Sequence, residues 1–166
     1  TRLRTVTGVQ TCALPIFVVA SPDAGGIRMA RAYAKKLSAG LAIVDKRRDS
    51  PEKTEVMHIL GDVKGKHVIL VDDIIATGSS VMEAIEELKK RGANDVYAAV
   101  SHGVLSGNAL EKISSSKALK EVVITNSIPL PEPEKNTKIK VLSIASLLAE
   151  AIKRIHEEKS ISCLFF

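Results

Sequence analysis

A continuous apolar run at residues 68–71, Val-Ile-Leu-Val, constrains the fold of this chain more than any other feature. A strand with one solvated face alternates apolar and polar residues, so an unbroken run fits a strand buried on both faces of a parallel sheet. Asp72 and Asp73 follow the run directly, and residues 81–90 then repeat apolar side chains at helical spacing. The segment therefore predicts a strand, a short polar loop and a helix in succession.

Strand-like and helix-like segments alternate along the rest of the chain. The apolar runs predict strands at residues 17–20, 41–44, 56–60, 67–71, 96–100, 122–125 and 139–144. Apolar residues at helical spacing predict helices at residues 27–37, 81–90, 107–114 and 144–155. Repeated units of this kind predict an α/β fold, a doubly wound and mainly parallel sheet with helices on both faces.

The loop at residues 76–80 has the composition of a sugar-phosphate site. Thr77, Ser79 and Ser80 offer hydroxyl donors, and Gly78 permits a positive φ or a close approach of the backbone. The helix that follows adds free N–H groups and the positive end of its dipole, and the preceding aspartates suit the hydroxyls of a ribose. No lysine follows in the Walker manner, which excludes an ATPase P-loop. Plain turn chemistry with an N-cap is the alternative.

A second candidate anion site, Ser-Pro-Asp-Ala-Gly-Gly at residues 21–26, follows the first predicted strand. Gly25 and Gly26 permit backbone N–H groups to face a polyphosphate, and Asp23 could hold Mg²⁺ through water. A bland turn is the alternative. Because ligands in open α/β sheets bind at the carboxyl ends of strands, both loops are expected at one edge of the sheet.

The cluster Lys46-Arg47-Arg48 ends the second predicted strand and precedes a polar segment. Phosphoryl and diphosphoryl transfer need cations placed where charge builds on the moving group, so Lys46 and Arg48 are candidates for that role. A solvated basic loop is the alternative. His102 falls at the end of another predicted strand, where a structural role or a subunit contact is favoured over catalysis.

Length and composition narrow the class of partner. The chain has 166 residues, which suits one domain, and a formal net charge of +5. Its basic residues are scattered and its aromatic residues are few, so phosphorylated small molecules are favoured over nucleic acid. Cys12 and Cys163 have no metal-ligand spacing and favour a reducing, cytoplasmic setting, and no apolar run has membrane-spanning length. Residues 1–16 fit neither period and are expected to be a foreign or junctional segment, with an edge strand as the alternative.

Together these segments resemble the C-terminal half of the ribose-phosphate pyrophosphokinases, or phosphoribosyl pyrophosphate synthetases, over residues 17–166. The resemblance rests on seven segments: Ser-Pro-Asp-Ala-Gly-Gly (21–26), Asp-Lys-Arg-Arg (45–48), Glu-Val-Met-His-Ile-Leu-Gly-Asp-Val (55–63), Val-Asp-Asp (71–73), His-Gly-Val-Leu-Ser-Gly (102–107), Leu-Ala-Glu-Ala-Ile-Lys-Arg-Ile-His (148–156) and Ser-Ile-Ser (160–162). The acidic loop alone is shared by all type I phosphoribosyltransferases, so the combination is what makes the resemblance specific.

The resemblance implies transfer of diphosphate from ATP to the 1-hydroxyl of ribose 5-phosphate, which gives phosphoribosyl pyrophosphate and AMP for nucleotide biosynthesis. It implies that Asp23, Ala24, Gly25 and Gly26 form a pyrophosphate loop, with Asp23 helping to bind Mg²⁺. Lys46 and Arg48 would be catalytic, and Arg48 would also bind substrate. The remaining substrate-binding residues would be Asp72, Asp73, Ala76, Thr77, Gly78, Ser79 and Ser80.

Two departures from the family pattern bear on function. Ala76 stands where the synthetases usually carry an aspartate, which favours slightly the alternative of a phosphoribosyltransferase. The family's N-terminal half, which supplies most of the ATP pocket, is not found in this sequence. The chain is therefore expected to bind ribose 5-phosphate weakly and to make no product alone. A homo-oligomer is implied, and a non-catalytic regulatory relative is the other alternative.

Overall fold

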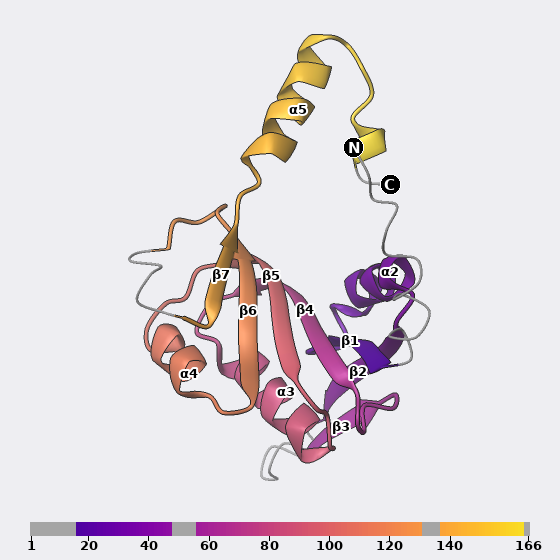
Figure 1. Ribbon diagram of the computed structural model, residues 1–166, viewed down its shortest axis with the longest axis vertical. Coiled ribbons are helices and arrows are strands. Elements are labelled where there is room, and N and C mark those ends of the chain that lie inside the picture. The colour runs from indigo at the N-terminus through magenta and orange to yellow at the C-terminus, as the bar shows by residue number, and fades with distance from the viewer. Residues whose placement is uncertain (1–15, 48–55, 131–136, 165–166) are drawn as a thin grey trace.

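One seven-stranded sheet organises the chain (Figure 1). The computed structural model describes residues 16–47, 56–130 and 137–164. The strands are β1 (Phe17–Ser21), β2 (Gly40–Arg47), β3 (Val56–Leu60), β4 (His67–Ile75), β5 (Val96–Gly103), β6 (Leu119–Thr125) and β7 (Ile139–Leu142). Their spatial order is β3-β2-β1-β4-β5-β6-β7. All seven predicted strands are present.

The pairing is parallel except at one edge. β1 pairs in parallel with β2 and β4, and parallel pairing continues through β5 and β6 to β7. β3 returns antiparallel to β2, with Lys46 opposite Met57. The strand order turns outward from β1 in both directions, which is the arrangement of a doubly wound sheet. The predicted fold class is confirmed.

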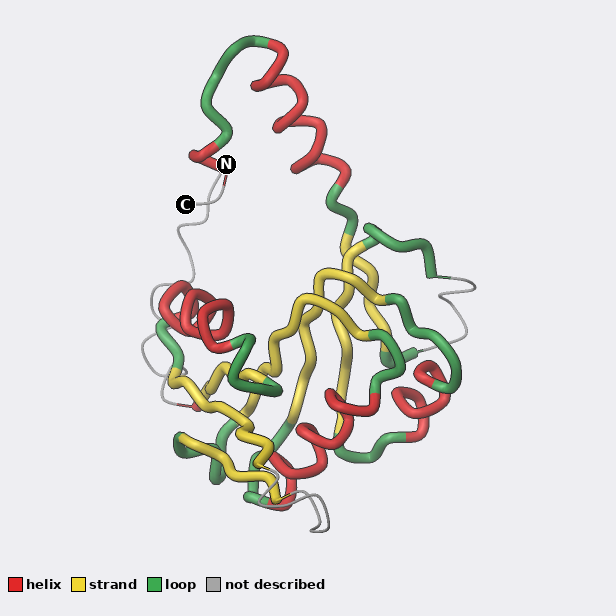
Figure 2. Tube along the Cα trace, turned by 180° about the vertical axis from the view of Figure 1, so that it is seen from behind, coloured by secondary structure: helices red, strands yellow, loops and turns green. Residues whose placement is uncertain are grey.

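Helices cover both faces of the sheet (Figures 1 and 2). In the described residues the α-helices are α2 (Ile27–Leu37), α3 (Ser79–Lys90), α4 (Ala109–Ser115) and α5 (Ala145–His156). Because successive side chains of a strand point to opposite faces, β1 divides its residues between two apolar clusters. Val18 packs in a cluster with residues of α3 and α4, whereas Val19 packs with Ala30 and Ala34 of α2.

The helix that follows the loop at residues 76–80 buries its predicted face. Val81, Ala84, Ile85 and Leu88 of α3 are all buried, at the spacing that places them on one side of a helix. α3 therefore has a fixed position on the sheet, and so does the loop that leads into it. α2 is held less deeply, since only its two alanines are buried and Leu37 remains 42% exposed.

The C-terminal helix forms as predicted, but its apolar face is not covered. No residue of α5 is buried, and Leu148, Ile152 and Ile155 are 52%, 67% and 63% exposed. Figure 1 shows α5 projecting beyond the end of β7. The side chain of Asn126 fixes where the chain leaves the sheet, because its Oδ1 accepts a hydrogen bond of 2.9 Å from the N–H of Ile144.

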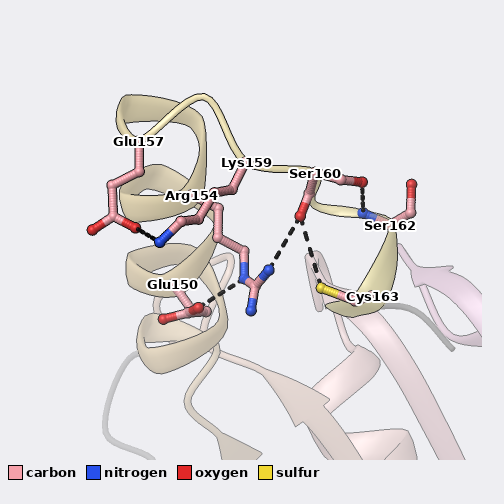
Figure 3. A network of polar contacts seen from close by, with 7 residues as sticks. All are labelled: Glu150, Arg154, Glu157, Lys159, Ser160, Ser162 and Cys163. Carbon is pink, nitrogen blue, oxygen red and sulfur yellow. Dashed lines mark hydrogen bonds and ion pairs between the residues drawn. The ribbon is translucent and has the colours of Figure 1, made fainter.

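A polar network folds the segment after α5 back onto the helix (Figure 3). Arg154 donates to Glu150 at 2.7 Å and to the carbonyl of Ser160 at 3.3 Å. The thiol of Cys163, a free and exposed cysteine, lies 3.7 Å from the same carbonyl. Within the described ranges, no helix combines the length and the hydropathy that a membrane span requires.

Candidate sugar-phosphate and diphosphate site

The acidic pair lies inside β4 and not in the loop after it. The apolar run predicts a strand that ends at residue 71, but β4 continues to Ile75 because β5 still offers partners, with Asp72 opposite Val100 and Ile74 opposite His102. Asp72 is partly buried and Asp73 is exposed. The sheet backbone therefore holds both carboxylates more firmly than a loop would.

The loop between β4 and α3 encloses a cavity of about 260 Å³ together with the acidic pair. Gly78 has a φ of 73°, which confirms the expected positive φ, and α3 begins at the next residue. The cavity is lined by Asp23, Asp72, Asp73 and residues 74–81. The structure thus brings the carboxylates, the hydroxyls and the start of α3 to one place, as the sequence of the acidic pair and of the loop after it predicts.

Asp72 is the titratable group that this cavity perturbs most clearly. Burial raises the pKa of its carboxyl to about 6, and the nearby charges of Asp73 and Asp23 act in the same direction. The N–H of Asp73 donates to Asp72 Oδ1 at 2.9 Å and opposes the rise in pKa. A carboxylate whose charge is unfavourable in the free protein is suited to a ligand that supplies hydrogen-bond donors or a cation.

The loop at residues 21–26 is held by its own side chains. Ser21 Oγ donates to the carbonyl of Asp23 at 2.7 Å, and the N–H of Gly26 donates to Asp23 Oδ1 at 2.9 Å. A Cβ at Gly26 would lie 2.5 Å from Ser21 Oγ, so any larger residue there would have to displace the Ser21 hydroxyl. Asp23 accepts the hydrogen bond of this N–H, and the expected role of the loop toward a polyphosphate stays a prediction.

A second cavity, of about 590 Å³, adjoins the first. It is lined by Asp23, Gly25, Gly26, Arg28, Met29, Asp72 and Asp73. Three carboxylates therefore border both cavities, and Arg28 places a guanidinium beside the 21–26 loop. Arg28 was not among the residues singled out in the sequence, where it is one of several basic residues on a helical pattern.

The carboxylates fit Mg²⁺ only as a partial ligand set. In the described part of the chain no three His, Cys, Asp or Glu side chains are placed to hold a metal together. Mg²⁺ usually binds to one or two carboxylates and completes its shell with waters and substrate phosphates. Asp23 meets that requirement, because it borders both cavities and one of its oxygens is not used by Gly26.

The predicted cationic residues are placed only in part. The register of β1 on β2 sets Ser21 opposite Ile43, so the backbone of Lys46 lies past the carboxyl end of β1 and toward the edge that carries Asp23. Arg48 lies outside the described residues, as does nearly all of the 1–16 segment.

His102 is exposed on β5, and its Nδ1 lies 2.9 Å from Ser127 Oγ, in keeping with the structural role favoured for it.

Lys112 of α4 is a second residue that the sequence patterns do not indicate. Its Nζ lies 2.8 Å from Ser79 Oγ and 3.3 Å from the carbonyl oxygen of Thr77. The contact spans 33 residues of sequence to Ser79, so no local spacing could reveal it. A cation from another helix therefore contacts the loop at residues 76–80 directly.

The chain is similar to known proteins of one kind. The model of a family described as "phosphoribosyl synthetase-associated domain" matches residues 47–166. A ribose-phosphate pyrophosphokinase of Caldanaerobacter subterraneus subsp. tengcongensis is 56% identical over 148 residues, 89% of this chain and 46% of the relative. A ribose-phosphate pyrophosphokinase of Clostridium acetobutylicum is 53% identical over 148 residues, again 89% of this chain and 46% of the relative. This chain thus spans just under half the length of these relatives.

Solved structures support the same fold. A crystal structure of phosphoribosylpyrophosphate synthetase from Mycobacterium smegmatis has a TM-score of 0.79 and 39% identity, covering 87% of this chain and 46% of that one. An adenine phosphoribosyltransferase has a TM-score of 0.52 at 21% identity and covers 72% of each chain, a likeness that shows the fold alone. Together they identify the sheet as that of the type I phosphoribosyltransferases.

Proposed function

Because this chain belongs to the phosphoribosyl synthetase-associated domain family, we propose that it forms the ribose 5-phosphate and diphosphate-binding part of a ribose-phosphate diphosphokinase. The reaction transfers the diphosphoryl group of ATP to the 1-hydroxyl of ribose 5-phosphate and gives phosphoribosyl pyrophosphate and AMP. The observation that carries the proposal is that two adjoining cavities share Asp23, Asp72 and Asp73. One cavity suits the phosphorylated pentose, and the other suits the diphosphate that is transferred to it.

The first cavity would bind the sugar. Asp72 and Asp73 accept hydrogen bonds from the ribose hydroxyls, which are donors that match ionised carboxylates. The 5-phosphate lies against residues 76–80, where the hydroxyls and the first N–H groups of α3 are donors. Ala76 offers no side-chain hydrogen bond, so the backbone and the neighbouring hydroxyls supply these contacts.

The second cavity would bind the diphosphate. Asp23 is the residue that would hold Mg²⁺, with Ala24, Gly25 and Gly26 completing the pyrophosphate loop. The metal supplies neutralisation of charge on the transferred group when it is bound. Lys46 and Arg48 are proposed to bring positive charge to the same group during transfer, and Arg28 is placed to contact its oxygens.

The whole protein is proposed to act in the cytoplasm as a homo-oligomer. Its proposed partners are ATP and ribose 5-phosphate. Neither a nucleic acid nor a membrane is proposed as a partner. The chain alone is expected to bind ribose 5-phosphate weakly and to make no product, since it spans under half the length of its relatives.

Calorimetric titration of the chain with ribose 5-phosphate tests the sugar site. The double variant Asp72→Asn/Asp73→Asn should lose binding, because both ionised acceptors are removed. Asp62→Asn is the matched control and should bind like the wild type, since Asp62 pairs with Lys66 away from either cavity. Unchanged binding by the double variant would refute the proposed site.

The reaction is tested separately by measuring AMP released from ATP and ribose 5-phosphate. Clear turnover by the pure chain would contradict the expectation that it is inactive alone. Turnover of phosphoribosyl pyrophosphate with a nucleobase, and none with ATP, would replace the proposed diphosphokinase with a phosphoribosyltransferase.

A further inference from the structure

The phosphate site proposed at residues 76–80 has no basic residue among the described residues of its cavity wall. The described residues that line this cavity comprise three aspartates, apolar residues, Gly78 and hydroxyls, and none of them is basic. A phosphate beside three carboxylates therefore depends on hydrogen-bond donors, and the direction of each donor matters more than it would beside a cation. Lys112 contacts the loop but does not line the cavity.

Lys112 determines which way the hydroxyl of Ser79 can point. A hydroxyl has one hydrogen and two acceptor lone pairs, whereas an ammonium group can only donate. At 2.8 Å from Lys112 Nζ, Ser79 Oγ must therefore accept. The Ser79 hydrogen then points elsewhere, and Ser79 lines the cavity. Thr77 Oγ1 donates to Ser79 Oγ at 3.5 Å, so this weak contact also uses Ser79 as an acceptor and leaves the Ser79 hydrogen for another partner.

The second contact of Lys112 orients the backbone of the loop. Its Nζ lies 3.3 Å from the carbonyl oxygen of Thr77, so that carbonyl points toward α4. The peptide that joins Thr77 to Gly78 is trans, as are all peptide bonds in the described residues, and its C=O and N–H point in opposite directions. The N–H of Gly78 therefore points away from Lys112.

We propose that Lys112 is a positioning residue for the phosphate of the bound sugar. It holds the Ser79 hydroxyl and the Gly78 N–H as donors toward the anion and does not itself contact the phosphate. The half-buried position of Lys112 suits this role, because it limits the conformations open to a long side chain. This inference rests on the proposed function, since it assigns a role within the same sugar-phosphate site.

The test is a titration of the ¹⁵N-labelled chain with inorganic phosphate and then with ribose 5-phosphate, followed through the amides of residues 77–81. Lys112→Met removes the ammonium group and keeps an unbranched side chain, so it should weaken binding roughly tenfold, which corresponds to ~1.4 kcal/mol. Lys112→Arg keeps the charge and donors and should recover most of the affinity. Lys117→Met, an exposed lysine two residues past α4, should bind like the wild type.

A double-mutant cycle separates positioning from direct contact. If Lys112 acts through Ser79, Lys112→Met should weaken binding much less in a Ser79→Ala background than in the wild type. Equal losses in both backgrounds would overturn the proposal, and so would wild-type affinity in Lys112→Met. If the wild type gives no response at residues 77–81, the sugar-phosphate site itself fails, an outcome distinct from failure of the Lys112 role alone.

A structure of the wild-type chain with ribose 5-phosphate tests the inference without any variant. Lys112 Nζ is expected to remain on Ser79 Oγ, with phosphate oxygens on Ser79 and Gly78. A direct hydrogen bond from Lys112 to the phosphate would overturn the proposal. This measurement also decides the matter if Lys112→Met does not fold.

Discussion

Replacing Asp72 with asparagine should stabilise the folded chain at neutral pH and change its stability little near pH 4. Burial raises the pKa of this carboxyl to about 6 in the folded chain, from an ordinary value of 3.8. Above pH 6 the folded chain therefore carries a charge that is more favourable in the unfolded chain. Asparagine has no charge and retains the oxygen that accepts the N–H of Asp73.

The size of the effect follows from the difference in pKa. A rise from 3.8 to about 6 corresponds to ~3 kcal/mol at 1.36 kcal/mol per pKa unit. Asp72 is only partly buried, so solvent screening reduces the expected gain to about 1–2 kcal/mol. The sign is set by proton binding: between pH 4 and 6 the folded chain holds the proton and the unfolded chain does not, so wild-type stability falls as pH rises through this window.

Urea unfolding of the wild type and Asp72→Asn at pH 4 and pH 7.5 measures this difference. The variant should be more stable at pH 7.5, and most of the gain should disappear at pH 4. Asp95→Asn is a control of opposite sign, because the hydrogen bond from Lys120 lowers the pKa of Asp95. Equal stability of Asp72→Asn and the wild type at pH 7.5, or a gain that persists at pH 4, would refute the reasoning.

Three further variants test the backbone and the C-terminal helix by the same urea assay. Gly78→Ala should cost about 1 kcal/mol, since the φ of 73° is strained for alanine while its Cβ would meet only ordinary contacts at 3.7 Å. Gly61→Ala should cost clearly more, because its φ is 106° and its Cβ would lie 2.6 Å from a backbone oxygen. The double change Leu148→Gln/Ile152→Gln should stay within about 0.5 kcal/mol of the wild type, because both side chains are more than half exposed. A large loss of stability in that variant would show that α5 packs against the sheet.

The order of strands and helices could be predicted because each has a distinct period of apolar residues. The helical spacing in α3 gives its four buried residues correctly. The end of β4 could not be predicted in the same way, since Asp72 and Asp73 interrupt the apolar run while hydrogen bonds to β5 continue through Ile75. Pairing with a neighbouring strand decides that boundary, and side-chain hydropathy does not report it.

The two loops of the candidate site could be predicted because each directly follows a strand. Parallel strands end at one edge, so local sequence was sufficient to place Asp23 near Asp72. Lys112 could not be found in this way, because only the packing of α4 beside α3 brings it to Ser79. The element that packs against a helix is equally a non-local matter. Periodicity predicts the apolar face of α5 but does not indicate which residues, if any, pack against that face.

The exposed position of α5 has a consequence for hydrogen exchange. α3 is packed onto the sheet through side chains with no solvent exposure, such as Ile85 and Leu88. Exchange of the α3 amides should therefore require opening of the whole domain. α5 has 12 residues, none of them buried, and a helix of that length is marginal in water without packing. Its amides should exchange by local fraying, many times faster than those of α3, so that a single domain shows two well-separated levels of protection.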